Sequence, residues 1–168
     1  MNAPVAAGDW ESERRRATRQ LLWFVRGSFM LVGSLPFWLP LLIAWLPLGP
    51  VGVILDGMFV LVCHRQPERT LELAGVAMPV CSRCAGMFAG MALGMLVCWP
   101  RPTLKQARWA LGGAGLLMLA DVLAQDFGLH PLWHWSRLGT GALLGYIGSI
   151  ALVAAIARER NYSLRITG

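Results

Sequence analysis

Long apolar segments constrain the fold of this chain more than any other feature of its sequence. A helix needs about 20 consecutive apolar residues to cross a bilayer. The chain offers four candidate segments of roughly this kind, the second of which is short: Leu21–Pro47, Ala85–Pro100, Trp109–Gln125 and Leu138–Ala157. They predict an all-α fold, a polytopic membrane helix bundle with about four transmembrane helices.

Composition supports the same conclusion. Apolar residues make up 56% of the chain and charged residues only 14%, whereas a soluble domain usually carries about 25% charged residues. The mean hydropathy is +0.54. We therefore expect an integral membrane protein whose main partner is the lipid bilayer. The isoelectric point near 9.9 would suit nucleic acid, but the basic residues form no DNA- or RNA-binding signature, so we expect no such partner.

The positions of the basic residues predict how the chain crosses the membrane. Val51–Val62 is apolar but too short for a comfortable span, and we expect a re-entrant, interfacial or short buried segment there. If it does not cross, the arginine-rich N-terminus, the segment around Lys105 and the arginine-containing C-terminus share one side. Basic residues favour the cytoplasmic side. We therefore expect a multi-pass protein of the cell (inner) membrane with both termini in the cytoplasm.

This topology divides the chain into three parts and exposes two loops on one side. Residues 1–20 form a polar cytoplasmic tail, residues 21–160 the membrane bundle, and residues 161–168 a second cytoplasmic tail. Two spans separate the Cys63–Cys84 segment, which we call the cysteine loop, from the Asp126–Arg137 connection. The two loops therefore lie on the same side of the membrane, which we expect to be the outer side.

Glycines recur every four residues in two of the expected spans. Gly86, Gly90 and Gly94 lie in the second span, and Gly141 and Gly145 lie in the last. Small residues at this spacing let helices approach closely. We expect helix–helix packing without chemistry at these positions, either within the chain or in a homo-oligomer.

The cysteine loop carries the ligating chemistry of the chain. Cys81-Ser-Arg-Cys84 is a C-x-x-C pair, whose turn directs two sulfurs at one ion, and Cys63 supplies a third sulfur from across the loop. In the leading interpretation His64 completes the ligand set, although adjacent residues do not easily bind one metal. The alternatives for the fourth ligand are His130, His134 and water. We expect zinc or another divalent metal, in a structural rather than a catalytic site.

Thiol redox chemistry is the competing interpretation of the same cysteines. The second span is expected to begin near Cys81, so the C-x-x-C pair would lie in the first turn of a helix, where the helix dipole favours thiolate. An outward-facing site lies in an oxidising compartment, where disulfides persist. A membrane thiol–disulfide oxidoreductase with Cys63 as resolving thiol, and a static disulfide, are both alternatives. The fourth cysteine, Cys98, lies about 21 Å along the helix from Cys84 and is not expected to take part.

Arginines surround the cysteines and have two interpretations. Arg65, Glu68 and Arg69 follow Cys63 closely, and Arg83 lies within the C-x-x-C pair. Three thiolates on a divalent ion leave one negative charge, which nearby arginines would offset. Alternatively, the arginines bind an anion such as a lipid phosphate, because guanidinium groups suit phosphate well. The candidate cofactor-binding residues are Arg65, Arg83 and Gln125.

Asp121 and Gln125 are the most informative polar residues inside a span. Their spacing places them on one helix face near the outer end, and ionisable groups in spans are functional candidates. Arg137 begins the last span at a similar level, so an Asp121–Arg137 ion pair is the simplest expectation. A third hypothesis is an enzyme or carrier for an anionic lipid headgroup. Its candidate catalytic residues are Glu68, Arg69, Asp121 and Arg137.

Two specific motifs lie in the cysteine loop: C-H-R-x-P-E-R at Cys63–Arg69 and P-x-C-x-R-C-x-G at Pro79–Gly86. They resemble a family of small prokaryotic membrane proteins grouped as a domain of unknown function. The resemblance covers roughly Val51 to Ala157 and extends to Asp121, Gln125, Arg137, Gly139 and Gly141. It implies that these positions belong together and implies no activity. Relatives tend to have a small polar stretch where this chain has DFGLHPLWHWS, which ranks His130 and His134 lower as ligands.

Overall fold

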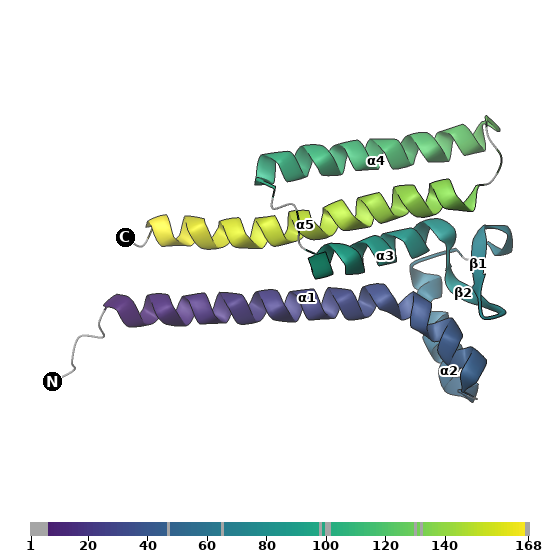
Figure 1. Cartoon of the computed structure of the whole chain (residues 1–168), viewed down its shortest axis with the longest axis horizontal. Coiled ribbons are helices and arrows are strands. Elements are labelled where there is room, and N and C mark those ends of the chain that lie inside the picture. Colours follow the sequence, from purple (N-terminus) through teal and green to yellow (C-terminus); the bar gives the residue numbers. More distant parts are fainter. Residues whose placement is uncertain are drawn as a thin grey trace.

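The computed structural model describes residues 7–46, 48–64, 66–97, 99, 102–129, 131 and 133–166. The described chain is mostly helical, which confirms the predicted membrane helix fold in its main part (Figure 1). In chain order its elements are α1 (Ala7–Trp45), α2 (Gly49–Met58), η1 (Phe59–Leu61), η2 (Pro67–Arg69), β1 (Thr70–Leu73), β2 (Val76–Cys81), α3 (Ser82–Val97), α4 (Leu104–Asp126) and α5 (His134–Ile166).

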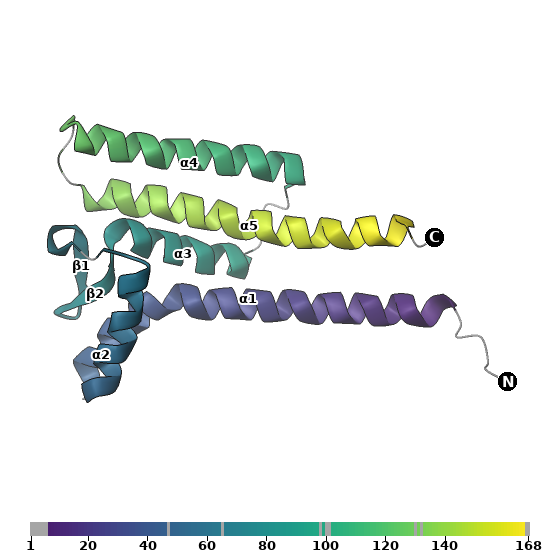
Figure 2. The same ribbon diagram turned by 180° about the vertical axis from the view of Figure 1, so that it is seen from behind.

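Four helices lie side by side in the order α1, α3, α5, α4 (Figures 1 and 2). Helices α3 and α5 run parallel, and α1 and α4 run in the opposite direction. The start of α1 and the end of α5 therefore lie at one end of the row, and the β1–β2 hairpin lies at the other end with the end of α4 and the start of α5. This arrangement agrees with the expectation that the two loops share a side. Helix α2 lies at the loop end and does not run along the row.

Three of the described helices are long and apolar enough to cross a membrane, by length and composition. These candidate spans are Arg15–Trp45 of α1, Leu104–Asp126 of α4 and His134–Ile156 of α5. Helix α3 has 16 residues, or about 24 Å at 1.5 Å per residue, less than a hydrocarbon core of about 30 Å. Of the about four expected spans, three correspond to long candidate helices among the described residues, and the fourth, Ala85–Pro100, falls on the short apolar helix α3. The short one lies between α1 and α5, which cover two of its sides.

The helices also extend into the segments expected to be tails. Helix α1 begins at Ala7, within residues 1–20, and α5 continues to Ile166, within residues 161–168. The boundary between tail and bundle is therefore not a change of secondary structure. The cytoplasmic placement of both tails stays a prediction.

Helices α3 and α5 meet through glycines contributed by both. A Cβ atom at Gly90 would fall on the backbone carbonyl of Ala142, and one at Gly145 would fall on the carbonyl of Met87. The glycine seam, as we call this contact, consists of Gly86, Gly90, Gly94, Gly141 and Gly145. Because small residues let backbones approach closely, these glycines are used within the chain. They are not free for the homo-oligomer contact that the sequence also allowed.

Arg26 of α1 closes the end of α3 opposite the cysteines. Its Nε donates to the carbonyl of Met95 at 3.0 Å and its Nη2 to the carbonyl of Leu96 at 3.2 Å. The last carbonyls of a helix lack partners within the helix and carry the negative end of its dipole. An arginine satisfies both needs, which explains why a charged residue interrupts the apolar part of α1.

The cysteine loop contains a β-hairpin that the all-α prediction did not include. Strands β1 and β2 pair antiparallel, with Thr70 opposite Cys81. The two connecting residues, Ala74 and Gly75, have φ angles of 55° and 76°, as the tightest hairpin turns require. Alternation of apolar and polar residues in Thr70–Leu73 was the sequence signal for a strand. The signal was weak because Ala-Gly is not among the dipeptides that favour such turns.

An apolar cluster fixes the hairpin to the helices. Its buried members lie in α1, η1, β2 and α3 and in the chain just after η1. They are Leu39, Phe59, Cys63, Met78, Val80 and Ala85. Phe59 also packs edge-to-face against Phe88, with the ring centroids 6.0 Å apart. Burying a large apolar side chain contributes about 1.5–3 kcal/mol. The loop end of the bundle is therefore a packed core.

We predict that Gly90→Ala destabilises the protein by about 1–3 kcal/mol, the usual cost of overpacking. The added methyl group meets the backbone of α5, which cannot rotate away. The free energy of unfolding in detergent micelles measures the effect. Gly112→Ala on α4 is the matched control, because nothing lies within 4 Å of its Cβ position. Equal stability of the two variants would contradict the close approach of α3 and α5 at Gly90.

Candidate metal centre

Three cysteines meet at the loop end of the bundle. The sulfur atoms of Cys63, Cys81 and Cys84 lie within 4.8 Å of one another, and all three are free thiols. Cys63 follows η1, Cys81 ends β2, and Cys84 lies in the first turn of α3. The hairpin and the start of α3 therefore create the cluster. The structure brings together the three sulfurs that the sequence singled out.

Hydrogen bonds affect the two sulfurs of the C-x-x-C pair in opposite directions. The hydrogen bond between the two side chains lowers the pKa of Cys81, whereas the same bond, together with burial, raises the pKa of the Cys84 thiol. The backbone N–H of Cys81 donates to the Cys63 sulfur at 3.2 Å. The Cys81 sulfur accepts hydrogen bonds from the Cys84 thiol and from the backbone N–H groups of Cys84 and Arg83, and these bonds lower the pKa of Cys81 well below its usual value. Because thiolate is the form that binds metals, the cluster favours the ligating state of Cys81.

The spacing of the sulfurs fits a tetrahedral metal ion. Zinc binds thiolates at about 2.3 Å, which places the sulfurs of a tetrahedral site about 3.8 Å apart. Since the three sulfurs already lie within 4.8 Å of one another, each pair needs to close by no more than about 1 Å.

The histidines are less well placed than the cysteines. His64 is exposed and lines the same cavity as the cysteines, but its ring nitrogens do not belong to the cluster. His134 begins α5, and its buried Nδ1 has no hydrogen-bond partner among the described residues. His130 and Arg65 lie outside the described residues, as does Cys98. In the described part of the chain, the centre is a three-sulfur cluster.

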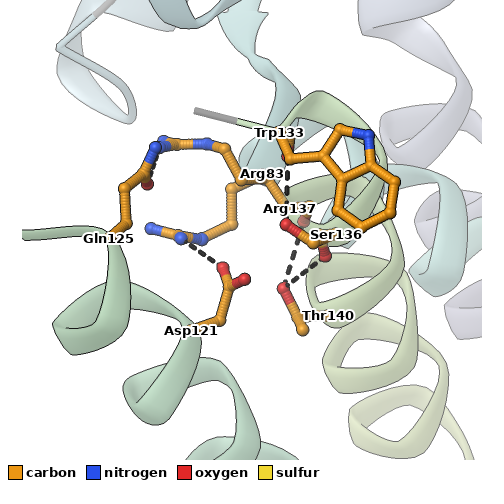
Figure 3. Close-up of polar contacts among 7 residues, drawn as sticks. All are labelled: Arg83, Asp121, Gln125, Trp133, Ser136, Arg137 and Thr140. Atoms are coloured by element: carbon orange, nitrogen blue, oxygen red, sulfur yellow. Dashed lines mark hydrogen bonds and ion pairs between the residues drawn. The ribbon is translucent and has the colours of Figure 1, made fainter. Parts of the chain in front are cut away.

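Two arginines connect the cysteine loop and α5 to α4 (Figure 3). Arg83 Nη2 lies 2.6 Å from Asp121 Oδ2, in an ion pair whose side chains are 11% and 10% exposed. Arg137 Nη1 donates to Gln125 Oε1 at 2.5 Å. Asp121 and Gln125 face the same way, as their spacing predicted. The structure differs from the expected Asp121–Arg137 ion pair, since the described ion pair joins Asp121 to Arg83 and Arg137 donates to Gln125.

An open cavity of about 370 Å³ lies beside the sulfur cluster. Its polar wall contains Arg69, Arg83 and Arg137 together with the three cysteines, and we call it the arginine pocket. The other lining residues are Val62, His64, Gln66, Met87 and Met118. Asp121 and Gln125 are not lining residues but hold two of the arginines in place. Glu68 is exposed and also lies outside the wall.

The arginines of the pocket have hydrogen-bonding capacity to spare. Arg137 is only 3% exposed, and its Nε is buried without a hydrogen-bond partner among the described residues. The same holds for Nε of Arg83. Arg137 also interacts with the Cys81 sulfur and with the charges of Arg83 and Arg69. A buried unpaired donor costs about 1–3 kcal/mol, so these groups favour an acceptor in the pocket.

Comparisons with known proteins place the chain in a family of membrane proteins. Residues 63–151 match the family described as "Predicted membrane protein (DUF2085)". An uncharacterised protein of Methanocaldococcus jannaschii is 29% identical over 103 residues, which cover 57% of this chain and 64% of that protein. An uncharacterised protein of Methanothermobacter thermautotrophicus is 55% identical over 29 residues, which cover 17% of this chain and 26% of that protein. The chain thus spans less than two thirds of either relative. No solved structure matches it.

We predict that Asp121→Asn destabilises the protein by about 3 kcal/mol, because it leaves the buried charge of Arg83 without this counter-ion. The free energy of unfolding in detergent micelles measures the loss. Asp126→Asn, on the exposed end of the same helix, is the control and should change stability by less than about 0.5 kcal/mol. Similar losses in the two variants would mean that the ion pair contributes nothing specific.

Proposed function

Because the chain belongs to the DUF2085 family of membrane proteins, a family described without an activity, we propose its function from the site itself. The protein is a membrane protein whose cysteine loop binds a divalent, zinc-type metal ion through Cys63, Cys81 and Cys84. The observation that carries this proposal is the convergence of three sulfurs from three separate elements to within 4.8 Å. The backbone N–H groups directed at Cys63 and Cys81 support it.

Metal binding would hold together the parts of the loop end. Cys63 belongs to the chain after η1, Cys81 to the hairpin and Cys84 to α3. One ion shared by these elements fixes the hairpin on the bundle, because a metal site formed only in the folded state adds its binding energy to folding. Backbone N–H···S bonds and the arginines around the cluster offset the excess negative charge of three thiolates.

The proposal includes the side of the membrane that the centre faces. Most basic residues lie outside the cysteine loop and the start of α5, and their positions favour cytoplasmic ends for the chain. The start of α1 and the end of α5 lie at the end of the row opposite the β1–β2 hairpin, whose last residue is Cys81 (Figure 2). The centre then faces the outside of the cell membrane, where free thiols are oxidised. A bound metal would keep the three cysteines from forming disulfides.

We predict about one equivalent of zinc or a similar divalent metal per chain in the protein purified without chelator. Elemental analysis gives the metal content. Replacement of Cys63, Cys81 or Cys84 by serine should reduce the content by at least about tenfold, since thiolate ligands dominate zinc affinity. Cobalt-loaded protein should also show thiolate-to-cobalt charge-transfer absorption that the serine variants lack.

Two controls sharpen this measurement. Cys98→Ser removes a cysteine that the sequence places far from the cluster, and it should leave the metal content unchanged. His64→Ala should also retain the metal, because His64 stands outside the cluster in the described structure. Metal-free wild-type protein with all thiols open to alkylation would refute the metal centre.

A second candidate function is thiol–disulfide exchange. It is favoured by the position of the C-x-x-C pair, with Cys81 immediately before α3 and Cys84 in its first turn. A Cys81–Cys84 disulfide would then form and exchange with an external dithiol, with Cys63 as resolving thiol. This function predicts a disulfide whose fraction follows the redox poise in a titration with oxidised and reduced dithiothreitol. Thiols that stay reduced at every poise would exclude it.

A further inference from the structure

The arginine pocket opens directly beside the three sulfurs, and its wall joins them to Arg69, Arg83 and Arg137. We infer that the pocket binds a phosphate group, either free or as part of a lipid headgroup, next to the fourth coordination position of the metal. This inference rests in part on the proposed metal centre and names the class of ligand that the centre takes. It treats the site as a binding site and assigns no reaction.

Charge is the first argument for an anion. Three thiolates exceed the charge of a divalent ion by one negative charge, and the Arg83–Asp121 ion pair is neutral. Arg69 and Arg137 then leave the described part of the pocket with one net positive charge. A buried or half-buried positive charge favours a counter-ion, because low polarity strengthens the attraction between opposite charges. A phosphate group supplies that charge.

Hydrogen bonding is the second argument, and it does not depend on the metal. Only 3% of the Arg137 surface is exposed, and its Nε has no hydrogen-bond partner among the described residues. Nη1 of the same side chain is held by Gln125, so the guanidinium is fixed in one orientation (Figure 3). Guanidinium groups bind phosphate through two parallel N–H···O bonds. A fixed guanidinium with an unused donor is therefore prepared for an oxyanion.

Coordination is the third argument. A tetrahedral ion held by three thiolates keeps one position for a ligand that is not protein, as in metal sites that bind substrate or water. Within the described residues the sulfur cluster contains three ligands, and the same three cysteines line the cavity. An oxygen of the phosphate group could occupy this position while its other oxygens accept from the arginines.

The walls and the location of the pocket suit both sources of phosphate. Met87, Met118 and Val62 form an apolar part of the wall, against which the carbon atoms of an organic phosphate or glycerol backbone can pack. The pocket is lined mainly by residues of the cysteine loop and of the starts of α3 and α5. These elements lie at one end of the row of helices (Figure 1), where the headgroups of a surrounding bilayer would be. The experiment must therefore separate free phosphate from headgroup phosphate.

The test uses the full chain in two parallel measurements. In the first, inorganic phosphate is titrated into metal-loaded and metal-free protein in a phosphate-free detergent, and binding is followed by calorimetry. In the second, the protein is placed in nanodiscs of phosphatidylglycerol or phosphatidylcholine, extracted into detergent, and its retained lipid is counted by native mass spectrometry. We expect saturable binding in one of the two measurements. In cobalt-loaded protein, the phosphorus-31 resonance of the bound phosphate should broaden.

Two variants make the result specific. Arg69→Gln changes a half-exposed residue of the wall and should weaken binding by about tenfold, the effect of losing a charged hydrogen bond. Arg137→Lys keeps the charge but removes the planar guanidinium group with its parallel donors, and should weaken binding by a similar factor. Arg108→Gln changes an exposed arginine at the other end of α4 and should have no effect.

The outcomes separate this inference from the proposed metal centre. Binding of inorganic phosphate assigns a free phosphate compound, and retention of phosphatidylglycerol alone assigns a headgroup. Absence of both, or equal binding in wild type, Arg69→Gln and Arg137→Lys, overturns the inference while leaving the metal content to decide the centre. If the protein takes no metal, the comparison of metal-free wild type with Arg69→Gln still decides whether the pocket binds phosphate.

Discussion

The parallel contact of α3 with α5 is the constraint on which the rest of the structure depends. Gly141 of α5 lies against the backbone of Arg83, and Gly86 of α3 lies against the backbone of Leu138. The two helices therefore begin at the same level and almost touch. This places Arg83 and Arg137 beside each other, facing the same part of α4. A larger residue in the seam would separate the helices and, with them, the two arginines.

The cysteine cluster and the arginine pocket are connected through Arg83. Arg83 stands between Cys81 and Cys84 in sequence, and its side chain extends to Asp121 on α4. Its backbone N–H meanwhile helps to stabilise the Cys81 sulfur. A change at Asp121 can therefore reach the sulfurs through a single residue. The proposed metal and the inferred phosphate would each strengthen binding of the other, because a phosphate oxygen would complete the coordination of the metal.

Patterns along the chain predicted much of this architecture and failed at identifiable points. Segment length and hydropathy located α1, α3, α4 and α5, because a span must be apolar over most of its length. The sequence did not predict the hairpin, because a four-residue strand followed by an Ala-Gly turn carries little local pattern typical of a hairpin. The i, i+4 spacing of Asp121 and Gln125 predicted that they share a helix face. Spacing could not tell which arginine each would meet, because that depends on how α3 and α5 pack.

The sequence by itself determined the helical membrane fold, the shared end of the two loops and the membership of Cys63, Cys81 and Cys84 in one motif. These follow from lengths, charges and short spacings, which are local properties of a chain in a bilayer. Only the tertiary structure decided that Asp121 pairs with Arg83 and that the glycines of α3 and α5 lie against the backbone of the other helix. It also decided that the three cysteines line a cavity together with arginines. These are contacts between distant segments, and their partners are selected by the packing of backbones rather than by any local pattern.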